Sequence, residues 1–154
     1  MPKLQVTNDI CQMDKKHVSK NTIEIAVEPS SVWKTLTDPA EAKKYFFGAE
    51  LVTSWKEGDA IVFKGSYNGN NYEEKGELLC VRPNQRLQYT HWSNLESLPD
   101  LPENYRTWTF DLRQDGEITY LTMTEDNIPT TQQMERSDEF WMEVLQKIKT
   151  LSEN

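Results

Sequence analysis

The 154-residue chain is poor in several residue types, and each shortage argues against a class of protein. Its two cysteines, Cys11 and Cys80, lie far apart and form no C-x-x-C pair, so neither a disulfide framework nor a zinc ribbon is indicated. Only 17 lysines and arginines stand against 25 acidic residues, and the net charge of -8 disfavours nucleic acid and anionic membrane surfaces as partners. No apolar run approaches the ~18 residues of a membrane helix, and the first residues lack the apolar core of a signal peptide. We therefore expect a cytoplasmic protein with no membrane or nucleic-acid partner.

Recognisable catalytic patterns are equally scarce. The sequence contains no G-x-S-x-G, no H-E-x-x-H, no phosphate-binding glycine loop and no dinucleotide fingerprint. His17 and His91 are the only histidines, and no set of metal ligands stands at a suitable spacing. Adjacent strand residues point to opposite faces, so Glu73 and Glu74 cannot both enter one site, although Glu74 could reach a cavity rim. We predict no catalytic residue, no metal and no cofactor.

Aromatic residues, in contrast, are plentiful: five tryptophans, six tyrosines and five phenylalanines. Such side chains fill cores and also line ligand cavities, and composition does not separate these two roles. A chain of this length fits one domain and buries roughly 70% of the surface that its unfolded form exposes. We expect residues 1–17 to form an N-terminal arm and residues 18–154 to form the domain.

The hydrophobic pattern changes period along the chain. Alternation predicts a strand over residues 18–27, and Pro29 and the Asp38-Pro39 pair then mark the starts of two short helices, over 29–37 and 38–46. Alternation with turn residues between the segments predicts six further strands in an antiparallel meander. These strands span 50–54, 60–67, 72–81, 86–92, 106–113 and 117–125. Residues 93–104, with two prolines, are predicted to be a surface loop over the mouth of a cavity.

The last segment, residues 131–151, is predicted to be a long amphipathic helix. Its apolar stripe comprises Phe140, Trp141, Val144, Leu145, Ile148 and Leu151. The last two strands place their apolar side chains on one face and threonines on the other, so this face must meet the helix. The fold class is therefore α+β, a curved antiparallel sheet wrapped around a C-terminal helix.

This order of elements, with particular residues, resembles a known family. The matching stretches include VWKTLTDP at 32–39, GELL at 76–79, RLQY at 86–89, TYLTM at 119–123 and Trp141. They are similar to the START-like, or SRPBCC, superfamily with the helix-grip fold, and within it to bacterial homologues of the C-terminal domain of the heat-shock-chaperone ATPase activator. The resemblance implies a hydrophobic cavity between helix and sheet that takes lipids, polyketides or other aromatic molecules. Members often have glycine just before the helix tryptophan, where this chain has Phe140, whose ring would narrow the cavity.

Seven residues are predicted to surround the interior and to bind a ligand: Phe63, Tyr89, Trp108, Phe110, Met123, Phe140 and Trp141. Two interpretations stay open for them. Either they pack into a solid core, as interiors usually do, or they leave an apolar pocket in which Tyr89 and His91 offer directional hydrogen bonds.

Three functional hypotheses follow. The first is a noncatalytic protein that binds a small hydrophobic, aromatic or lipid-like molecule, so that Trp108→Ala weakens binding more than it disturbs folding. The second, implied by the resemblance, is a regulatory module that contacts a chaperone or another protein. The third is an enzyme acting on a cavity-bound substrate, for which no acid or base is identified. Either a monomer or a homodimer is compatible with the pattern.

Overall fold

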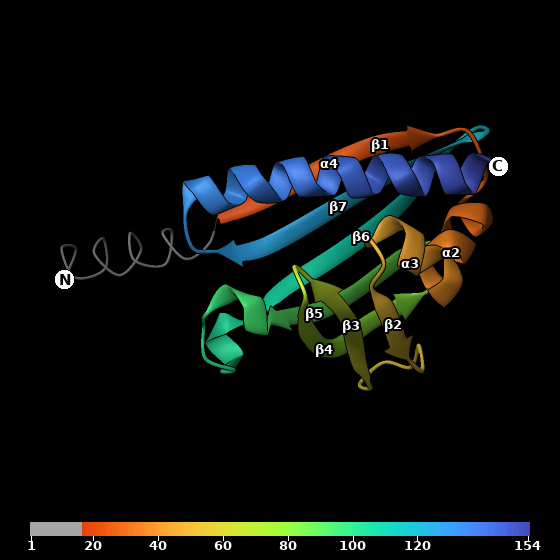
Figure 1. Ribbon diagram of the computed structural model, residues 1–154. Coiled ribbons are helices and arrows are strands. Elements are labelled where there is room, and N and C mark those ends of the chain that lie inside the picture. The colour runs from red at the N-terminus through yellow and green to blue at the C-terminus, as the bar shows by residue number, and fades with distance from the viewer. Residues whose placement is uncertain (1–16) are drawn as a thin grey trace.

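A computed structural model describes residues 17–154, which form a curved seven-stranded antiparallel sheet and three helices (Figure 1). The long helix lies across one face of the sheet, and the two short helices close the end near the C-terminus. The elements are β1 (His17–Ile25), α2 (Pro29–Thr37), α3 (Pro39–Tyr45), β2 (Glu50–Thr53), β3 (Ala60–Tyr67), β4 (Asn70–Arg82), β5 (Arg86–Ser93), β6 (Arg106–Asp115), β7 (Ile118–Ile128) and α4 (Thr131–Glu153). This architecture confirms the predicted α+β helix-grip fold. The predicted arm lies outside the described residues except for His17, which already belongs to β1.

Both short helices form where the sequence predicted, α2 with the predicted ends and α3 one residue shorter at each end. Pro29 occupies the first turn of α2, where its missing N–H would have no partner in any case. Asp38 ends α2 and caps α3, because its side chain accepts a hydrogen bond of 2.9 Å from the backbone N–H of Ala40. After α3 the chain turns through Phe47 and Gly48, which have φ of +54° and +92°. The left-handed turn holds the exposed Phe47 ring beside α4.

The sheet is a meander in the order β1-β7-β6-β5-β4-β3-β2, in which β1 pairs with the last strand. The strands β4 and β5 approach closely at Gly76, where an added Cβ would overlap the backbone carbonyl oxygen of Thr90. Just beyond, the pairing of β4 with β5 shifts register between Leu78 and Cys80. Such a shift bends a strand and increases its local twist, which fits the curvature of this half of the sheet.

The core lies between the sheet and α4. Trp141, Val144, Leu145 and Ile148 are fully buried, as the helical stripe predicted. Phe140, which the same prediction placed in the interior, is 37% exposed instead. Successive helical residues point about 100° apart, so with Trp141 at the centre of the stripe the Phe140 ring falls at its edge.

The segment between β5 and β6 is more ordered than the predicted surface loop. It contains two single-turn 3₁₀ helices, Asn94–Glu96 and Pro102–Asn104. The indole N–H of Trp92 donates a hydrogen bond of 3.2 Å to the carbonyl oxygen of Leu98, which ties the segment to the end of β5. Its first turn thereby stands opposite the beginning of α4 (Figure 1).

None of the helices within residues 17–154 has both the length and the apolar character that crossing a membrane would require.

Candidate functional site

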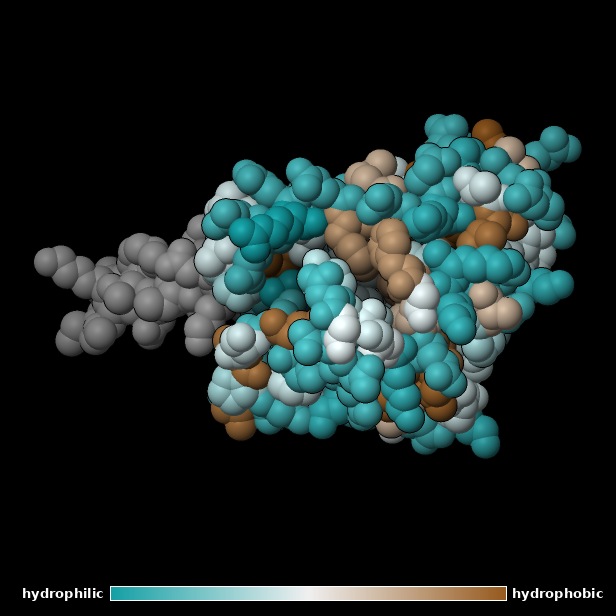
Figure 2. Space-filling model, in the orientation of Figure 1, coloured by the Kyte–Doolittle hydropathy of each residue, from teal (hydrophilic) through white to brown (hydrophobic). Residues whose placement is uncertain are grey.

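A pocket of about 510 Å³ opens between the sheet and the first half of α4. Figure 2 shows the surface hollowed there, between the start of α4 and the segment that follows β5. Three walls enclose it. The sheet contributes Glu74, His91, Ser93, Arg106, Trp108 and Glu125; the segment after β5 contributes Leu95 and Glu96; and α4 contributes Gln133, Arg136, Ser137 and Phe140.

At the floor of this pocket a buried carboxylate joins the sheet to the helix. The Glu125 side chain on β7 accepts hydrogen bonds from the indole N–H of Trp108, at 2.8 Å, and from that of Trp141, at 3.0 Å. The Nη1 of Arg106 lies 3.3 Å from Glu125 Oε2 and forms an ion pair with it. Glu125 is only 4% exposed. A buried charge is costly unless it is paired, and here one cation and two neutral donors share the two oxygens.

Arg106 extends this cluster to the rim. Its Nη2 donates a hydrogen bond of 3.1 Å to Oε1 of Gln133 on α4 and lies 3.4 Å from Oε1 of Glu96. One guanidinium group therefore connects β6, β7, α4 and the turn after β5. These polar contacts of Arg106, together with the apolar core, hold the walls of the pocket in place.

A second polar pair lies on the opposite side of the floor. Nε2 of His91 is 3.0 Å from Oε1 of Glu74, and the imidazole stacks on the Trp108 ring with centroids 3.7 Å apart. Burial alone would raise the pKa of the Glu74 carboxyl, but the hydrogen bond and charge of His91, with a hydrogen bond from Ser93, outweigh burial and hold that pKa below its usual value. An imidazole and a carboxylate in contact can hold or pass a proton, so the pocket contains one acid–base pair.

Strand register brings these groups together. Residues 106, 108 and 110 on β6 point to the same face of the sheet, as do residues 121, 123 and 125 on β7, because side chains alternate along a strand. Trp108 and Glu125 are directly paired across the two strands. Glu125 therefore continues the predicted inward set of β7, and Arg106 begins that of β6. Neither residue was predicted to have a role, although their alternation with apolar neighbours was the signal that could have found them.

The structure separates the seven predicted ligand-binding residues into two groups. Trp108 and Phe140 line the pocket. The other five are at most 2% exposed and lie in the core: Phe63, Tyr89, Phe110, Met123 and Trp141. The core rings contact one another, with centroids 5.8 Å apart for Phe63 and Tyr89 and 5.9 Å apart for Phe110 and Trp141.

Tyr89 and His91 were the predicted hydrogen-bonding groups. His91 lines the pocket, whereas Tyr89 lies in the core, where burial raises the pKa of its hydroxyl well above the ordinary value. Glu74 lines the pocket, as its face of β4 predicted, and Glu73 does not. For metal binding, residues 17–154 contain no group of three or more His, Cys, Asp or Glu side chains that could hold an ion.

A family model described as "Activator of Hsp90 ATPase homolog 1-like protein" matches residues 26–153. Among solved structures, ChR145 from Cytophaga hutchinsonii is 36% identical, with a TM-score of 0.79 over 90% of this chain and 95% of that one. A search of curated proteins finds no match.

Two more distant structures share the fold. Aha1 from Colwellia psychrerythraea, whose solution structure is a dimer, is 21% identical, with a TM-score of 0.69 over 89% of this chain and 96% of that one. CalU16 from Micromonospora echinospora is 16% identical, with a TM-score of 0.66 over 89% of this chain and 84% of that one. At these identities the likeness shows the fold alone, a fold that is compatible with ligand binding.

Proposed function

The chain belongs to the activator of Hsp90 ATPase homolog 1-like family, and from this premise we propose that it binds a small aromatic or otherwise apolar molecule between the sheet and α4. The observation that supports this proposal is the pocket of about 510 Å³, in which the rings of Trp108 and Phe140 lie among charged and polar side chains. Its volume is within the range of roughly 300–1,000 Å³ that small-molecule sites commonly have, and its polar groups can orient a ligand.

Phe140 offers the ligand most of its apolar contact, and Trp108, which is only 6% exposed, adds the part of its ring that reaches the pocket. Trp108 is held by its hydrogen bond to Glu125 and by the stacked His91, so its ring is fixed before any ligand arrives. Phe140 stands at the open edge of α4, where it is 37% exposed. A ligand ring placed between them would bury the Phe140 face, and fixed groups of this kind lower the entropy lost on binding. No catalysis is assigned to the site.

The first experiment is native mass spectrometry of the purified protein, followed by a thermal-shift screen with fatty acids, flavonoids and polyketide-like aromatic molecules. A ligand that binds only the folded state raises the free energy of unfolding by about 2.7 kcal/mol at a hundredfold excess over its Kd. We expect a retained molecule or a saturable shift with one chemical class.

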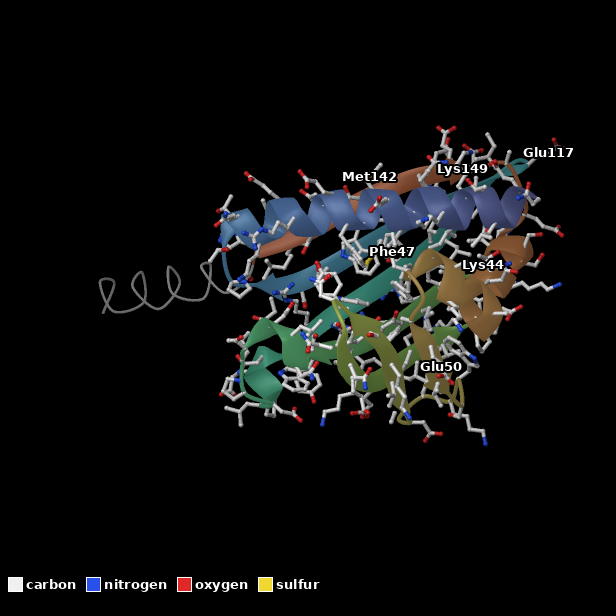
Figure 3. The ribbon with its side chains drawn as sticks, in the orientation of Figure 1. Lys44, Phe47, Glu50, Glu117, Met142 and Lys149 are labelled. Carbon is white, nitrogen blue, oxygen red and sulfur yellow. The ribbon has the colours of Figure 1, made fainter. Side chains whose placement is uncertain are left out.

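A pair of variants on α4 tests the location. Phe140→Ser removes an exposed ring that lines the pocket, and Met142→Ser removes an exposed apolar side chain that Figure 3 shows on the other side of the helix. We expect Phe140→Ser to weaken binding about tenfold, since ring burial is worth ~1–2 kcal/mol, and Met142→Ser to leave it unchanged. Equal binding by both variants, or no shift with any class, would contradict the proposal.

A second candidate function is a protein-binding module, in which the partner is a chaperone of the Hsp90 type. The observation that favours it is an exposed aromatic pair: Phe47 is 50% exposed and Phe140 is 37% exposed, with ring centroids 5.7 Å apart. Figure 2 shows apolar surface beside the middle of α4, and Figure 3 places Phe47 there. Exposed aromatic rings often anchor protein interfaces.

Phe47 does not belong to the pocket lining, so it separates the two functions. Added to a purified bacterial Hsp90, the wild-type protein should change the ATPase rate, and Phe47→Ser should abolish that change without altering small-molecule binding. An ATPase rate unaffected by the wild-type protein would rule this candidate out. We also propose that the protein is cytoplasmic and that it is a monomer or a homodimer. Sedimentation velocity distinguishes these two oligomeric states.

A further inference from the structure

The helix wall of the pocket offers hydrogen-bond donors in addition to those that the sheet wall uses. Gln133, Arg136 and Ser137 stand three and four residues apart on α4 and therefore share one face. Ser137 is only 9% exposed and its side chain lines the pocket. Arg136 forms no ion pair within residues 17–154. A guanidinium without a carboxylate partner and a hydroxyl on the same helix face are donors that an acceptor group of a ligand can use.

The sheet wall differs from the helix wall, because its carboxylates already have hydrogen-bond or ion-pair partners. Glu125 accepts from two indoles and pairs with Arg106, and Glu74 accepts from His91. Glu96 at the rim lies 3.4 Å from the Arg106 guanidinium. A cationic ligand would have to share carboxylates that already have a cation or a donor as partner. An anionic ligand would meet the Arg136 guanidinium, which has no ion pair within residues 17–154, and the Ser137 hydroxyl.

From this asymmetry we propose that the ligand is an aromatic carboxylate, with its ring on Trp108 and Phe140 and its carboxylate against Arg136 and Ser137 of α4. The inference rests on the proposed function, since it names the class of molecule that the same pocket takes. Arg136 offers the planar two-donor geometry that matches a carboxylate, and the Ser137 hydroxyl can donate to the same group. Gln133, whose amide oxygen accepts from Arg106, has an NH₂ group as a further donor on the same pocket-lining helix.

Three probes with one ring system isolate the charge of the ligand. They are 2-naphthoate, 2-naphthamide and 2-naphthylmethylammonium, each titrated into the full chain by isothermal calorimetry at low salt. We expect 2-naphthoate to bind about tenfold more tightly than the amide, and the ammonium to bind most weakly, because a charge-assisted hydrogen bond adds about that factor at a partly exposed site.

Two arginine variants supply the matched test. Arg136→Gln removes the free guanidinium of the pocket, and Arg82→Gln makes the same change in an exposed arginine at the end of β4. Arg82 lies eight residues along that strand from Glu74, about 26 Å away at ~3.3 Å per residue. Arg136→Gln should cut the affinity for 2-naphthoate about tenfold and leave 2-naphthamide within about twofold, while Arg82→Gln changes neither. Ser137→Ala, which suits a helix, should cost the carboxylate about threefold.

The outcomes separate the two proposals. If the amide or the ammonium binds at least as tightly as 2-naphthoate, or if Arg136→Gln and Arg82→Gln bind it equally, the carboxylate class is wrong while small-molecule binding stands. If none of the three probes binds and the earlier screen is also blank, the binding function itself falls.

Discussion

The buried carboxylate at the pocket floor gives the sharpest stability prediction. Glu125→Gln preserves the shape of the side chain but replaces one acceptor oxygen with an NH₂ group. Because Trp108 and Arg106 both donate to Oε2, and Trp141 donates to Oε1, one set of donors must then face another donor. The Arg106 side chain, which is 9% exposed, also loses its buried counter-charge.

The expected cost follows from these contacts. One buried donor left without a partner costs ~1–3 kcal/mol, and breaking a buried ion pair by removing one partner costs ~3–5 kcal/mol. Because the two effects overlap at one group, we expect a loss of about 4 kcal/mol in the free energy of unfolding. Domains are stable by only ~5–15 kcal/mol, so this is a large fraction of the total.

Urea denaturation followed by far-ultraviolet circular dichroism measures the loss. With a slope of about 2 kcal/mol per M, the midpoint should fall by about 2 M. The matched control is Glu117→Gln at the exposed turn between β6 and β7, visible at the far end of Figure 3, which should change stability by less than ~0.5 kcal/mol. The double variant of Glu125→Gln with Arg106→Met should cost about 2 kcal/mol less than the two single costs combined, since it leaves no unpaired charge.

A midpoint for Glu125→Gln within about 0.3 M of the wild type would refute this reasoning, because so small a change would mean that water already solvates the carboxylate. Purely additive single and double variants would show that Arg106 and Glu125 do not stabilise each other.

Three further predictions concern other parts of the fold. The pKa of Glu74 is lowered in the folded state, so its carboxylate contributes stability that is present above its unfolded value of 4.5 and lost as the pH falls through the folded value. Glu74→Gln should therefore lower the urea midpoint at neutral pH, and its difference from the wild type should shrink as the pH falls below 4.5; a difference that does not change with pH would contradict the prediction. Gly76→Ala should lower the free energy of unfolding by more than ~3 kcal/mol in thermal unfolding, because the added Cβ would overlap the Thr90 carbonyl oxygen. The control Gly69→Ala, in open space at φ +79°, should cost about 1 kcal/mol. Equal costs would contradict the close approach of the strands. Asp38→Ala should cost ~1 kcal/mol by calorimetry, and Asp38→Ser should restore most of it, unless the cap is not formed in solution.

The fold was predictable from the sequence because local signals agree with the tertiary structure. Alternation over β6 and β7 fixed which side chains face inward, and Trp108, Phe110, Leu121 and Met123 are buried as predicted or nearly so. Capping at Asp38 located the start of α3. Each of these signals depends on residues only a few positions apart, which is why a single sequence suffices.

The pocket was less predictable because it depends on contacts between distant segments. Arg106, Glu125 and Gln133 come from three elements, and only the register of β6 on β7 and the packing of α4 bring them together. Phe140 shows what helical periodicity does not predict. The pattern places it in the buried stripe, but it lies about 100° around the helix from the buried Trp141 and therefore lines the edge of the pocket. Sequence patterns also do not show whether the core rings pack solidly or leave a cavity, because this depends on packing density.

The most direct test of the binding site is an NMR titration of isotope-labelled protein with 2-naphthoate. The five tryptophan indole N–H groups give separate signals, so the tryptophans report on different regions of the chain. We predict saturable shifts of the Trp108 indole and of the backbone amides of His91 and residues 133–140, with Trp33 and Trp55 unchanged. Shifts confined to the outer face of the sheet around Lys75 and Tyr105, where a second pocket of about 570 Å³ lies, or no shifts at all, would contradict the account.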